Sequence, residues 1–280
     1  MRHAYLIIAH GNFKVLDALI NALDDARNDF YVHIDRRVDK LPALHAKKSG
    51  VTVLEKRIKV IWGDVSQIKA EYLLYEAALS CGGYDYYHLI SGVHYPLKSI
   101  DDIESFFVNH KGSSVLMDMP CAEDEIRMRF GRYHFFLSHL VDRRIWLNKL
   151  YHFCWRGALF LQRPLKPRDC SHIHGKASQW CSLTEDAVKA IISQKPRLLK
   201  KFRRTFCCDE FLVRSALEGS GCKMTFDHNL CFIDFVNTTP RIYALKDYDE
   251  LMSTGALFAR KMSDEVSMPL LKKIDECTRM

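Results

Sequence analysis

The sequence predicts an α/β protein with a mixed, mostly parallel central sheet flanked by helices. Two short apolar runs typical of buried strands, residues 4–9 and 29–35, enclose a stretch with apolar residues at helical spacing, residues 15–23. A strand, a helix and a strand at this spacing form a βαβ unit, which predicts that the two strands pair in parallel. The first run is too short to span a membrane, so we expect it to be a buried strand.

The same alternation continues along the chain. Helices are expected to begin at Ser66, Asp101 and Thr184, and Gly82 with Gly83 is expected to end the first of them. Further strands are expected at residues 51–53, 58–62, 84–90, 114–118, 178–183 and, as the last strand, 230–235.

The composition is that of an ordinary globular protein with a positive charge. Of the 280 residues, 48% are hydrophobic, which is enough to bury a sizeable core. The formal net charge of +7 indicates an anionic partner such as a nucleotide, a phospholipid surface or an acidic polymer. The ten cysteines form no C-x-x-C pair, which argues against a zinc ribbon or a thioredoxin-type site. We expect mostly reduced thiols, no targeting segment and a cytoplasmic location.

Polar residues fall at the carboxyl ends of the predicted strands. His10 and Asp35 follow the first two strands, and open α/β sheets bind their ligands at that edge. Ser91 and His94 follow the strand at 84–90, in a stretch of turn-forming residues that suits a loop approaching a ligand. The glycine pattern G-x-G-x-x-G is absent after the first strand, which disfavours a Rossmann dehydrogenase.

The stretch 206–213 places two adjacent carboxylates at a predicted helix start. Asp209 is the expected N-cap, and Glu210 belongs to the first turn. The positive end of the helix dipole favours an ionised carboxylate there, and such a carboxylate can act as a general base towards a substrate hydroxyl. Acidic residues also cap helices without any catalytic role, so a structural pair is the alternative.

Two basic stretches suggest partners. Between residues 143 and 161, arginine and tryptophan alternate with apolar residues, a composition found in membrane-surface or acceptor-binding segments. A cationic helix packed on its own domain explains the pattern equally well. The cations at 195–204 have apolar residues between them, so we interpret them as a solvated helix face rather than a nucleic-acid site.

An ordered set of short motifs resembles the core-2/I-branching N-acetylglucosaminyltransferase and peptide O-xylosyltransferase family. The set covers nearly the whole chain, and its order is more specific than any single motif. It comprises AYLIIAH at 4–10, HID at 33–35, WG at 62–63, LISG at 89–92, YPLK at 95–98, SQW at 178–180, DE at 209–210 and LFARK at 257–261. Between residues 121 and 168, only the run from 125 to 133 is similar to the family's acceptor segment.

The resemblance implies a GT-A-like nucleotide-sugar transferase fold and an inverting glycosyltransferase that uses a UDP-sugar, such as UDP-GlcNAc or UDP-xylose. It implies that Glu210 is the catalytic base and that Lys261, with Arg260 beside it, contacts the donor diphosphate. The other residues expected at the donor are His10, Asp35, Ser91 and His94, and those expected at the acceptor are Glu125, Arg129, Arg132 and Trp180. The chain then divides into a nucleotide-sugar-binding half, 1–118, and an acceptor and catalytic half, 119–280.

Members of the branching-enzyme type work without a metal, and the residues agree with that implication. A departing diphosphate needs positive charge, which Lys261 and Arg260 can supply in place of a metal ion. The one D-x-D triplet, at 247–249, lies late in the chain and is interpreted as a helix cap. His94 stands where the family commonly has an aspartate, which disfavours a metal further and leaves the donor sugar open. Arg241 is a candidate for a second arginine near the diphosphate.

Two other classes of protein remain as alternatives. One is a catalytically silent nucleotide-sugar- or glycan-binding protein of the same fold, since a fold does not determine a function. The other is an anionic-membrane- or nucleic-acid-binding module, suggested by the net charge. For the enzyme, the expected partners are a UDP-sugar donor, a glycan or lipid-linked glycan acceptor and the inner face of an anionic membrane; nucleic acid and metal are not expected.

Overall fold

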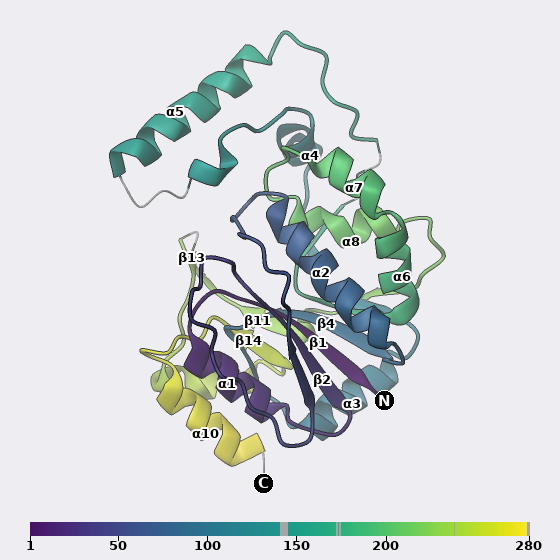
Figure 1. Ribbon diagram of the computed structural model, residues 1–280, viewed down its shortest axis with the longest axis vertical. Helices are drawn as coiled ribbons and strands as arrows, with labels where there is room; N and C mark the ends of the chain where they lie inside the picture. The colour runs from purple at the N-terminus through teal and green to yellow at the C-terminus, as the bar shows by residue number, and fades with distance from the viewer. Residues whose placement is uncertain (141–144, 172, 174, 238, 279–280) are drawn as a thin grey trace.

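The computed structural model describes residues 1–140, 145–171, 173, 175–237 and 239–278 of the chain. Its centre is a seven-stranded sheet in the order β10-β6-β9-β4-β1-β2-β3, with helices on both faces (Figure 1). The strands are β1 (His3–Ala9), β2 (Asn28–Ile34), β3 (Gly50–Val53), β4 (Tyr86–Ser91), β6 (Ser114–Leu116), β9 (Cys181–Thr184) and β10 (Met224–Phe226). Within this sheet only β9 runs antiparallel to its neighbours, so the predicted α/β fold with a mixed, mostly parallel sheet is confirmed.

The side chains of β1 alternate between two cores, because successive residues of a strand point to opposite faces of a sheet. Tyr5 and Ile7 belong to a core that also contains residues of α1 (Phe13–Ala22), α3 (Ile100–Asn109) and α10 (Met268–Thr278). Ala4 and Leu6 belong to the other core, with residues of α2 (Ser66–Cys81), α6 (Glu185–Ser193), α7 (Lys195–Phe202) and α8 (Asp209–Leu217). Burial on both faces explains why the strands are continuous apolar runs.

A three-stranded sheet, β11-β14-β5, brings the C-terminal part of the chain against the loop that follows β4. β14 (Phe258–Arg260) runs antiparallel to β5 (His94–Pro96), and Arg260 lies opposite His94. β11 (Cys231–Ile233) pairs with β14 on its other edge. The strand predicted at 230–235 therefore exists in shorter form, but it is not the last one, since β12 (Phe235–Val236), β13 (Thr239–Pro240) and β14 follow it.

The remaining elements are short, apart from α5 (Ile145–Leu161). Figure 1 shows α5 at the end of the molecule opposite the C-terminus, where it contacts the 3-10 helix η1 (Leu137–His139). The others are α4 (Glu123–Phe130), β7 (Asp118–Met119) paired with β8 (Lys176–Ala177), η2 (His228–Leu230), η3 (Leu245–Asp247) and α9 (Tyr248–Ser253). None of the helices in the described ranges has both the length and the apolar character needed to cross a bilayer. Residues 143 and 144 of the basic segment lie outside the described residues.

The strand predicted at 58–62 is wrong. The Ile58 amide donates to Nε2 of His33 at 3.1 Å, and the Val60 amide donates to Oδ2 of Asp35 at 2.9 Å. Both acceptors are side chains at the end of β2, so these amides are not available to a neighbouring strand. The segment is an irregular loop fastened to the end of β2.

The predicted helix boundaries are correct in part. Thr184 caps α6, since its side chain accepts a hydrogen bond from the Ala187 amide. Gly82 ends α2 with a φ of 65°, a left-handed conformation that favours glycine. Ser66 does not cap α2, because it is the first helical residue and its hydroxyl accepts from the Ile61 amide at 2.9 Å.

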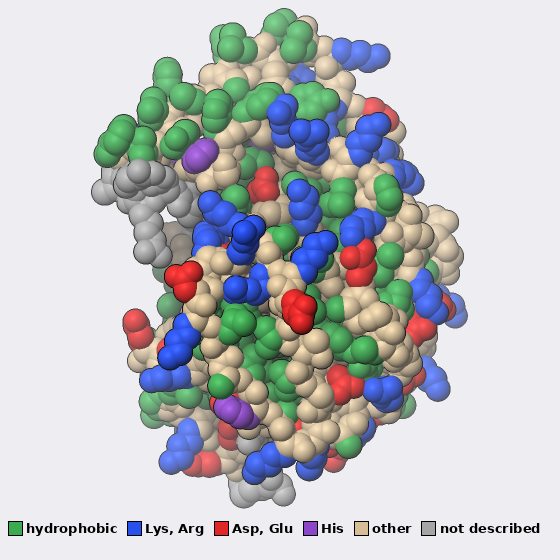
Figure 2. Space-filling model, viewed as in Figure 1, with side chains coloured by type: hydrophobic (Ala, Val, Ile, Leu, Met, Phe, Trp, Pro, Cys, Tyr) green, Lys and Arg blue, Asp and Glu red, His purple; other side chains and the backbone are tan. Residues whose placement is uncertain are grey.

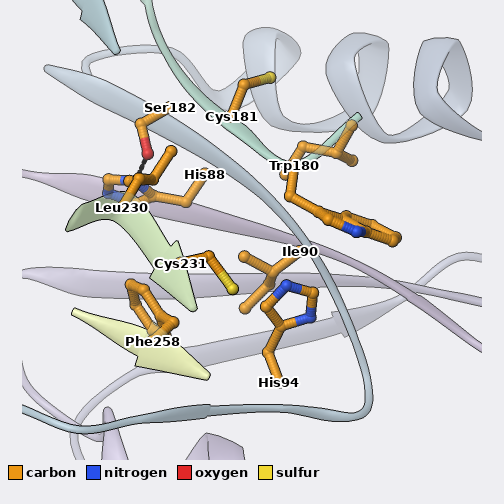
Figure 3. A pocket seen from close by; sticks show the side chains of 10 residues that line it. His88, Ile90, His94, Trp180, Cys181, Ser182, Leu230, Cys231 and Phe258 are labelled. Carbon is orange, nitrogen blue, oxygen red and sulfur yellow. Dashed lines mark hydrogen bonds between the residues drawn. The ribbon is translucent and has the colours of Figure 1, made fainter. Parts of the chain in front are cut away.

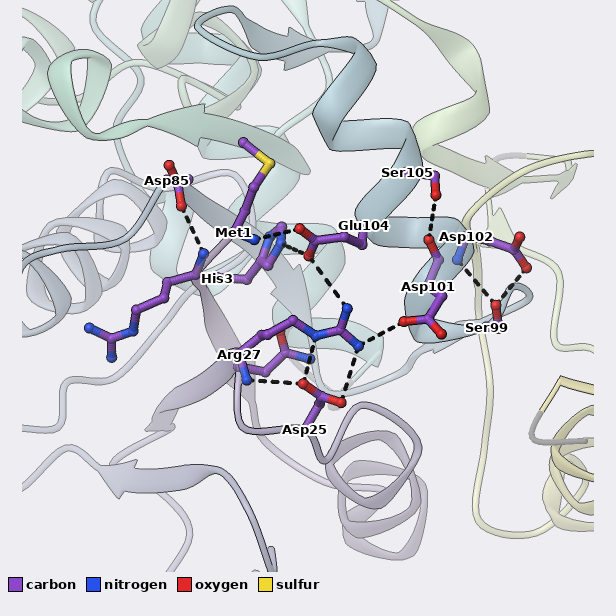
Figure 4. A network of polar contacts seen from close by, with 12 residues as sticks. Met1, His3, Asp25, Arg27, Asp85, Ser99, Asp101, Asp102, Glu104 and Ser105 are labelled. Carbon is purple, nitrogen blue, oxygen red and sulfur yellow. Dashed lines mark hydrogen bonds and ion pairs between the residues drawn. The ribbon is translucent and has the colours of Figure 1, made fainter.

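Ion pairs and a hydrogen bond fasten α3 to the amino ends of β1 and β2 (Figure 4). Glu104 of α3 lies 3.0 Å from Nε2 of His3 in β1. Arg27, which precedes β2, contacts Asp25 at 2.7 Å and Asp101 of α3 at 2.8 Å. The amino ends of β1 and β2 are therefore held by structural contacts, and the predicted site residues lie at the opposite ends of the strands.

We predict that Phe258 anchors the C-terminal segment. The side chain is 2% exposed and packs against Tyr5, with ring centroids 6.4 Å apart. Phe258→Ala leaves a cavity, so the free energy of unfolding should fall by about 3–5 kcal/mol. Phe153→Ala, at a side chain that is 76% exposed, is the control and should change it by less than about 0.5 kcal/mol. Urea unfolding measures both, and an unchanged midpoint for Phe258→Ala would show that β14 is not part of the cooperative core.

Candidate active site

Three predicted donor residues lie together at the carboxyl edge of the central sheet. His10 follows β1, Asp35 follows β2, and Ser91 ends β4. β1 pairs in parallel with β2 and with β4, and the Asp35 amide extends the ladder by donating to the Ala9 carbonyl at 2.8 Å. Parallel pairing thus brings the three strand ends side by side, at the edge where open α/β sheets bind ligands.

Asp35 is an ionised anchor at this edge. Burial raises the pKa of its carboxyl group, but hydrogen bonds from Arg37 and from the Val60 amide outweigh burial and hold that pKa at about 2. The Arg37 guanidinium binds both carboxyl oxygens at 2.8 Å, and the Val60 amide donates at 2.9 Å. Because both oxygens are engaged, Asp35 shapes the loops around the site in this structure.

Arg260 and Lys261 form a cation pair that has no carboxylate partner among the described residues. Arg260 is half-buried, its Nε atom is without a hydrogen-bond partner, and its guanidinium lies 5.1 Å from the centre of the Trp180 ring. Burial lowers the pKa of Arg260, and burial together with the charge of Arg260 lowers the pKa of Lys261. Burial and then the charge of Lys261 lower the pKa of His10. Because His10 follows β1, the cation pair lies near the carboxyl end of that strand. Two neighbouring cations held in this way favour an anionic ligand.

His94 supports the cation pair from the interior. The ring is fully buried, and its Nδ1 atom accepts a hydrogen bond from the Ser91 amide at 3.0 Å. Burial and the charge of Arg260 lower the pKa of His94 well below its usual value, so the ring is neutral and Nε2 carries the proton. The ring lies 5.0 Å from that of Trp180. In this placement His94 orients Ser91 and Trp180.

The cavity next to His94 is too small for a sugar nucleotide. It measures about 10 Å³, the space of one water molecule, and is bounded by Trp180, Cys231 and Phe258 among others (Figure 3). A larger hollow of about 380 Å³ lies around Tyr84 and Glu185, at the amino end of β4. Neither cavity coincides with the predicted donor residues as a group.

Glu210 belongs to a closed ring of two acids and two bases. It lies in the first turn of α8, as predicted. Its Oε2 atom contacts Arg129 at 2.7 Å and Lys176 at 3.4 Å, and Glu125 contacts the same two cations at 2.6 Å and 3.0 Å. The four formal charges cancel, in contrast to the cation pair. The structure thus joins two predicted acceptor residues, Glu125 and Arg129, to the predicted base in what we call the Glu210 ring.

The prediction that Asp209 is an N-cap is wrong. Cys208 occupies the cap position, and Asp209 is the first helical residue of α8. Its carboxyl group turns into the core, where Oδ2 accepts a hydrogen bond from Gln67 at 3.1 Å and Oδ1 has no partner. Burial and the charge of Glu210 raise the pKa of Asp209 to about 7. The two adjacent carboxylates therefore have different surroundings, since that of Asp209 lies in the core and that of Glu210 is ion-paired.

Gln179 and Trp180 lie between the cation pair and Asp209, the residue next to Glu210. Trp180 stacks on Arg260, and Gln179 lies 3.5 Å from Gln67, which binds Asp209. Trp180, predicted at the acceptor, is thus placed with the donor candidates. One short connection before β9 therefore contacts both Arg260 and the Gln67 side chain that binds Asp209.

Two predicted residues are engaged elsewhere. The Arg132 guanidinium donates to the carbonyl of the preceding residue at 3.0 Å. Arg241 contacts Asp234 at 3.4 Å, Glu250 at 3.1 Å and also Asp247, so its charge is neutralised by three carboxylates. One of the three carboxylates, that of Asp247, is the first acid of the D-x-D triplet. Across the described ranges, no group of three or more His, Cys, Asp or Glu side chains is arranged to hold a metal ion.

The sequence interpretation missed Lys176 and Gln67. Lys176 is the second cation of the Glu210 ring, and Gln67 is the partner of Asp209. The available signal for Lys176 was its position two residues before the SQW motif. Gln67 lies in a helix of mixed polarity and had no such signal.

The chain is similar to known proteins over nearly its whole length. Xylosyltransferase 2 from Homo sapiens is 22% identical to the chain over 98% of the chain and 33% of that protein. Xylosyltransferase oxt from Drosophila melanogaster is 22% identical over 99% of the chain and 33% of that protein. The chain spans about a third of the length of the curated relatives it matches.

The profile of the Core-2/I-Branching enzyme family matches residues 3–251. The chain belongs to this family, so the resemblance predicted from the ordered motifs is confirmed, together with its GT-A-like fold.

We predict that Asp209 makes stability fall as the pH rises. The unfolded chain ionises this carboxyl near pH 3.8, whereas the folded protein retains the proton up to about pH 7. Between these values the folded state binds more protons, so the free energy of unfolding decreases with pH. Asp209→Asn removes the titrating group, so its stability relative to the wild type should increase from pH 5 to pH 7, by up to about 1.4 kcal/mol per pH unit. Urea unfolding at the two pH values measures this, and a constant difference would show that folded Asp209 is ionised throughout.

Proposed function

We propose that the chain is an inverting glycosyltransferase that moves a sugar from a UDP-sugar to a hydroxyl group of a glycan or glycoconjugate, without a metal ion. The observation that carries this proposal is the Arg260–Lys261 pair, two cations beside a carboxyl edge of the sheet with no carboxylate partner among the described residues. A diphosphate is the anion that a nucleotide-sugar donor brings to such a place. Family membership supplies the reaction class.

In the proposed reaction Glu210 takes the proton of the acceptor hydroxyl as its oxygen attacks the anomeric carbon. The new bond forms on the face opposite the leaving group, and the bond between the anomeric carbon and the phosphate oxygen breaks. The electron pair leaves with UDP, and Arg260 and Lys261 stabilise the negative charge that develops there. Both ring contacts of Glu210 use Oε2, so its other oxygen, Oε1, is the one we assign to the acceptor proton.

The Glu210 ring has a second role in this proposal. Arg129 and Lys176 each bridge Glu210 and Glu125, so two cation contacts at Oε2 hold the base in one orientation. Glu125 shares the two cations, so Glu210 does not carry their full attraction alone.

The donor and the acceptor are part of the same proposal. The donor is UDP-GlcNAc or UDP-xylose, and the xylosyltransferase relatives give xylose a place among the candidates. The acceptor is a glycan or lipid-linked glycan, and we propose a soluble or peripheral cytoplasmic enzyme. The catalytically silent alternative shares the fold, and the first test below separates it from an enzyme.

We predict that Glu210→Gln abolishes transfer but not donor binding. The variant keeps the shape of the side chain and removes the base, so turnover should fall by about two to four orders of magnitude. UDP affinity should be nearly unchanged, because Glu210 lies in the acid–base ring and not beside the cation pair. Turnover is measured by UDP release with a verified acceptor, and UDP affinity by calorimetry.

Asp209→Asn is the matched control and should retain most of the activity, because its side chain faces the core. Wild-type turnover by Glu210→Gln would refute the assignment of the base. A dead Asp209→Asn with an active Glu210→Gln would move the base to Asp209.

We predict that Lys261→Ala weakens UDP binding and that EDTA leaves activity unchanged. A charged hydrogen bond to phosphate is worth about 1.5–3 kcal/mol. The affinity for UDP, and for whichever of UDP-GlcNAc and UDP-xylose binds the wild type, should therefore fall by roughly 10- to 150-fold. Lys272→Ala, at an exposed lysine of α10, is the control and should not change affinity. Thermal shift with each UDP-sugar identifies the donor, since a ligand of the native state raises apparent stability. Strict dependence on added manganese, or unchanged affinity in Lys261→Ala, would contradict the proposal.

A further inference from the structure

The outward face of α5 and the turn after it is apolar, although it is not covered by any described part of the chain. Six large side chains on it are between 48% and 76% exposed: Trp146, Leu150, Phe153, Phe160, Leu161 and Leu165. Figure 2 shows hydrophobic side chains gathered at this end of the molecule, with lysines and arginines beside them. We call these six side chains the α5 surface.

The spacing of the α5 surface is helical. Residues 146, 150, 153, 157 and 160 follow one another in steps of four and three, which places them on one side of a helix. Residue 157 is a glycine and adds no side chain between Phe153 and Phe160. The helix therefore presents a continuous apolar stripe to the outside.

The inner side of α5 contacts the protein through hydrogen bonds and ring stacking. Asn148 donates to the Leu140 carbonyl at 2.6 Å, and Trp155 donates to Nδ1 of His134 at 3.1 Å. The ring of Tyr151 stacks on that of His139 at 4.4 Å. A helix on the surface of a soluble domain normally turns polar residues outward, so the large apolar side chains that α5 leaves exposed indicate an external apolar partner. Trp155 belongs to the inner side and not to the α5 surface, in contrast to Trp146.

The charge around the α5 surface has one sign. Residues 145–168 contain five lysines and arginines and no aspartate or glutamate. Four of these cations, Lys149, Arg156, Arg163 and Lys166, are exposed, and the Arg163 guanidinium lies over the Phe160 ring at 5.0 Å. A second copy of the chain is a poor partner for this face, because a twofold contact would bring the same four cations together.

We propose that the α5 surface binds an anionic phospholipid bilayer, with α5 lying in the plane of the interface. The apolar stripe would enter the boundary between headgroups and acyl chains, and the four cations would contact lipid phosphates. This inference does not depend on the transfer reaction, since it concerns a surface that contains none of the proposed donor or acceptor residues.

A bilayer bound to the α5 surface would have a definite position relative to the Glu210 ring. On the inner side of α5 the ring centres of Trp155 and Phe206 lie 5.9 Å apart. The Phe206 ring centre lies 5.9 Å from the guanidinium carbon of Arg129, a member of the Glu210 ring. A bilayer under α5 would therefore lie near the ring, and a lipid-linked acceptor would reach Glu210 from the membrane. This is the acceptor class that a bound bilayer favours.

Co-sedimentation with vesicles tests the proposal. The protein should bind vesicles of phosphatidylcholine with phosphatidylglycerol at low salt, bind pure phosphatidylcholine at least tenfold more weakly, and dissociate as salt is raised. Trp146→Ser with Phe153→Ser should lower binding to the mixed vesicles at least tenfold, and so should Arg156→Glu with Arg163→Glu. Leu41→Ser with Val108→Ser, at two exposed apolar residues outside α5, is the matched control and should bind like the wild type.

UDP calorimetry on each variant shows whether the fold and the donor site are intact, so a loss of vesicle binding is not mistaken for unfolding. If the wild type binds no UDP but still binds anionic vesicles, the proposed function fails and the membrane inference stands. No binding to mixed vesicles at low salt overturns the inference. Equal binding to neutral vesicles overturns it as well, and so does full binding by Trp146→Ser with Phe153→Ser. If the wild type binds no vesicles but forms a dimer, and this double variant is monomeric, the α5 surface is assigned to a second copy of the chain.

Discussion

The parallel pairing of β1 with β2 on one side and β4 on the other is the constraint on which the rest of the structure depends. It aligns the strands from His3 opposite Asn28 to Ala9 opposite Ile34, and it aligns β4 in the same direction. All three strands therefore end at one edge, and the loops that carry His10, Asp35 and Ser91 start there. The β5–β14 pairing then adds the C-terminal cations to the loop that leaves β4. A shift of one residue in this register would exchange the two cores of β1 and disperse the site.

The two groups of charged residues differ in how their charges are compensated. In the Glu210 ring two acids and two bases satisfy one another, which is the arrangement a partly buried charged cluster needs to be stable without a ligand. Arg260 and Lys261 have no such compensation among the described residues, and their pKa values are lowered as a result of burial. An anion that binds there removes an electrostatic cost that the unliganded protein carries. This difference supports our assignment of the cation pair to the donor and of the ring to the acceptor.

A buried acid pair lies behind the ring. Burial and the charge of Asp209 raise the pKa of Glu71 well above its usual value, and the amide of Gln179 donates to this carboxyl group at 2.8 Å. Buried carboxyl groups cost stability unless they are protonated or paired, so their presence beside the first turn of α8 indicates that this part of the core is not optimised for stability alone. The cost falls at the helix that holds Glu210, where a fixed orientation of the base matters most.

The sequence by itself determined the α/β fold class, the first βαβ unit and the position of Glu210 in a first helical turn, because strand length, helical spacing and adjacent residues are local properties. It also determined the family, because the order of the motifs is a property of the chain. Only the tertiary structure decided that Lys176 completes the ring, that Asp209 faces Gln67 instead of capping α8, and that Arg241 is neutralised by three acids. It also decided that Trp146 faces outward while Trp155 faces inward. Each of these depends on which distant side chains share a buried space, and no local pattern of residues contains that information.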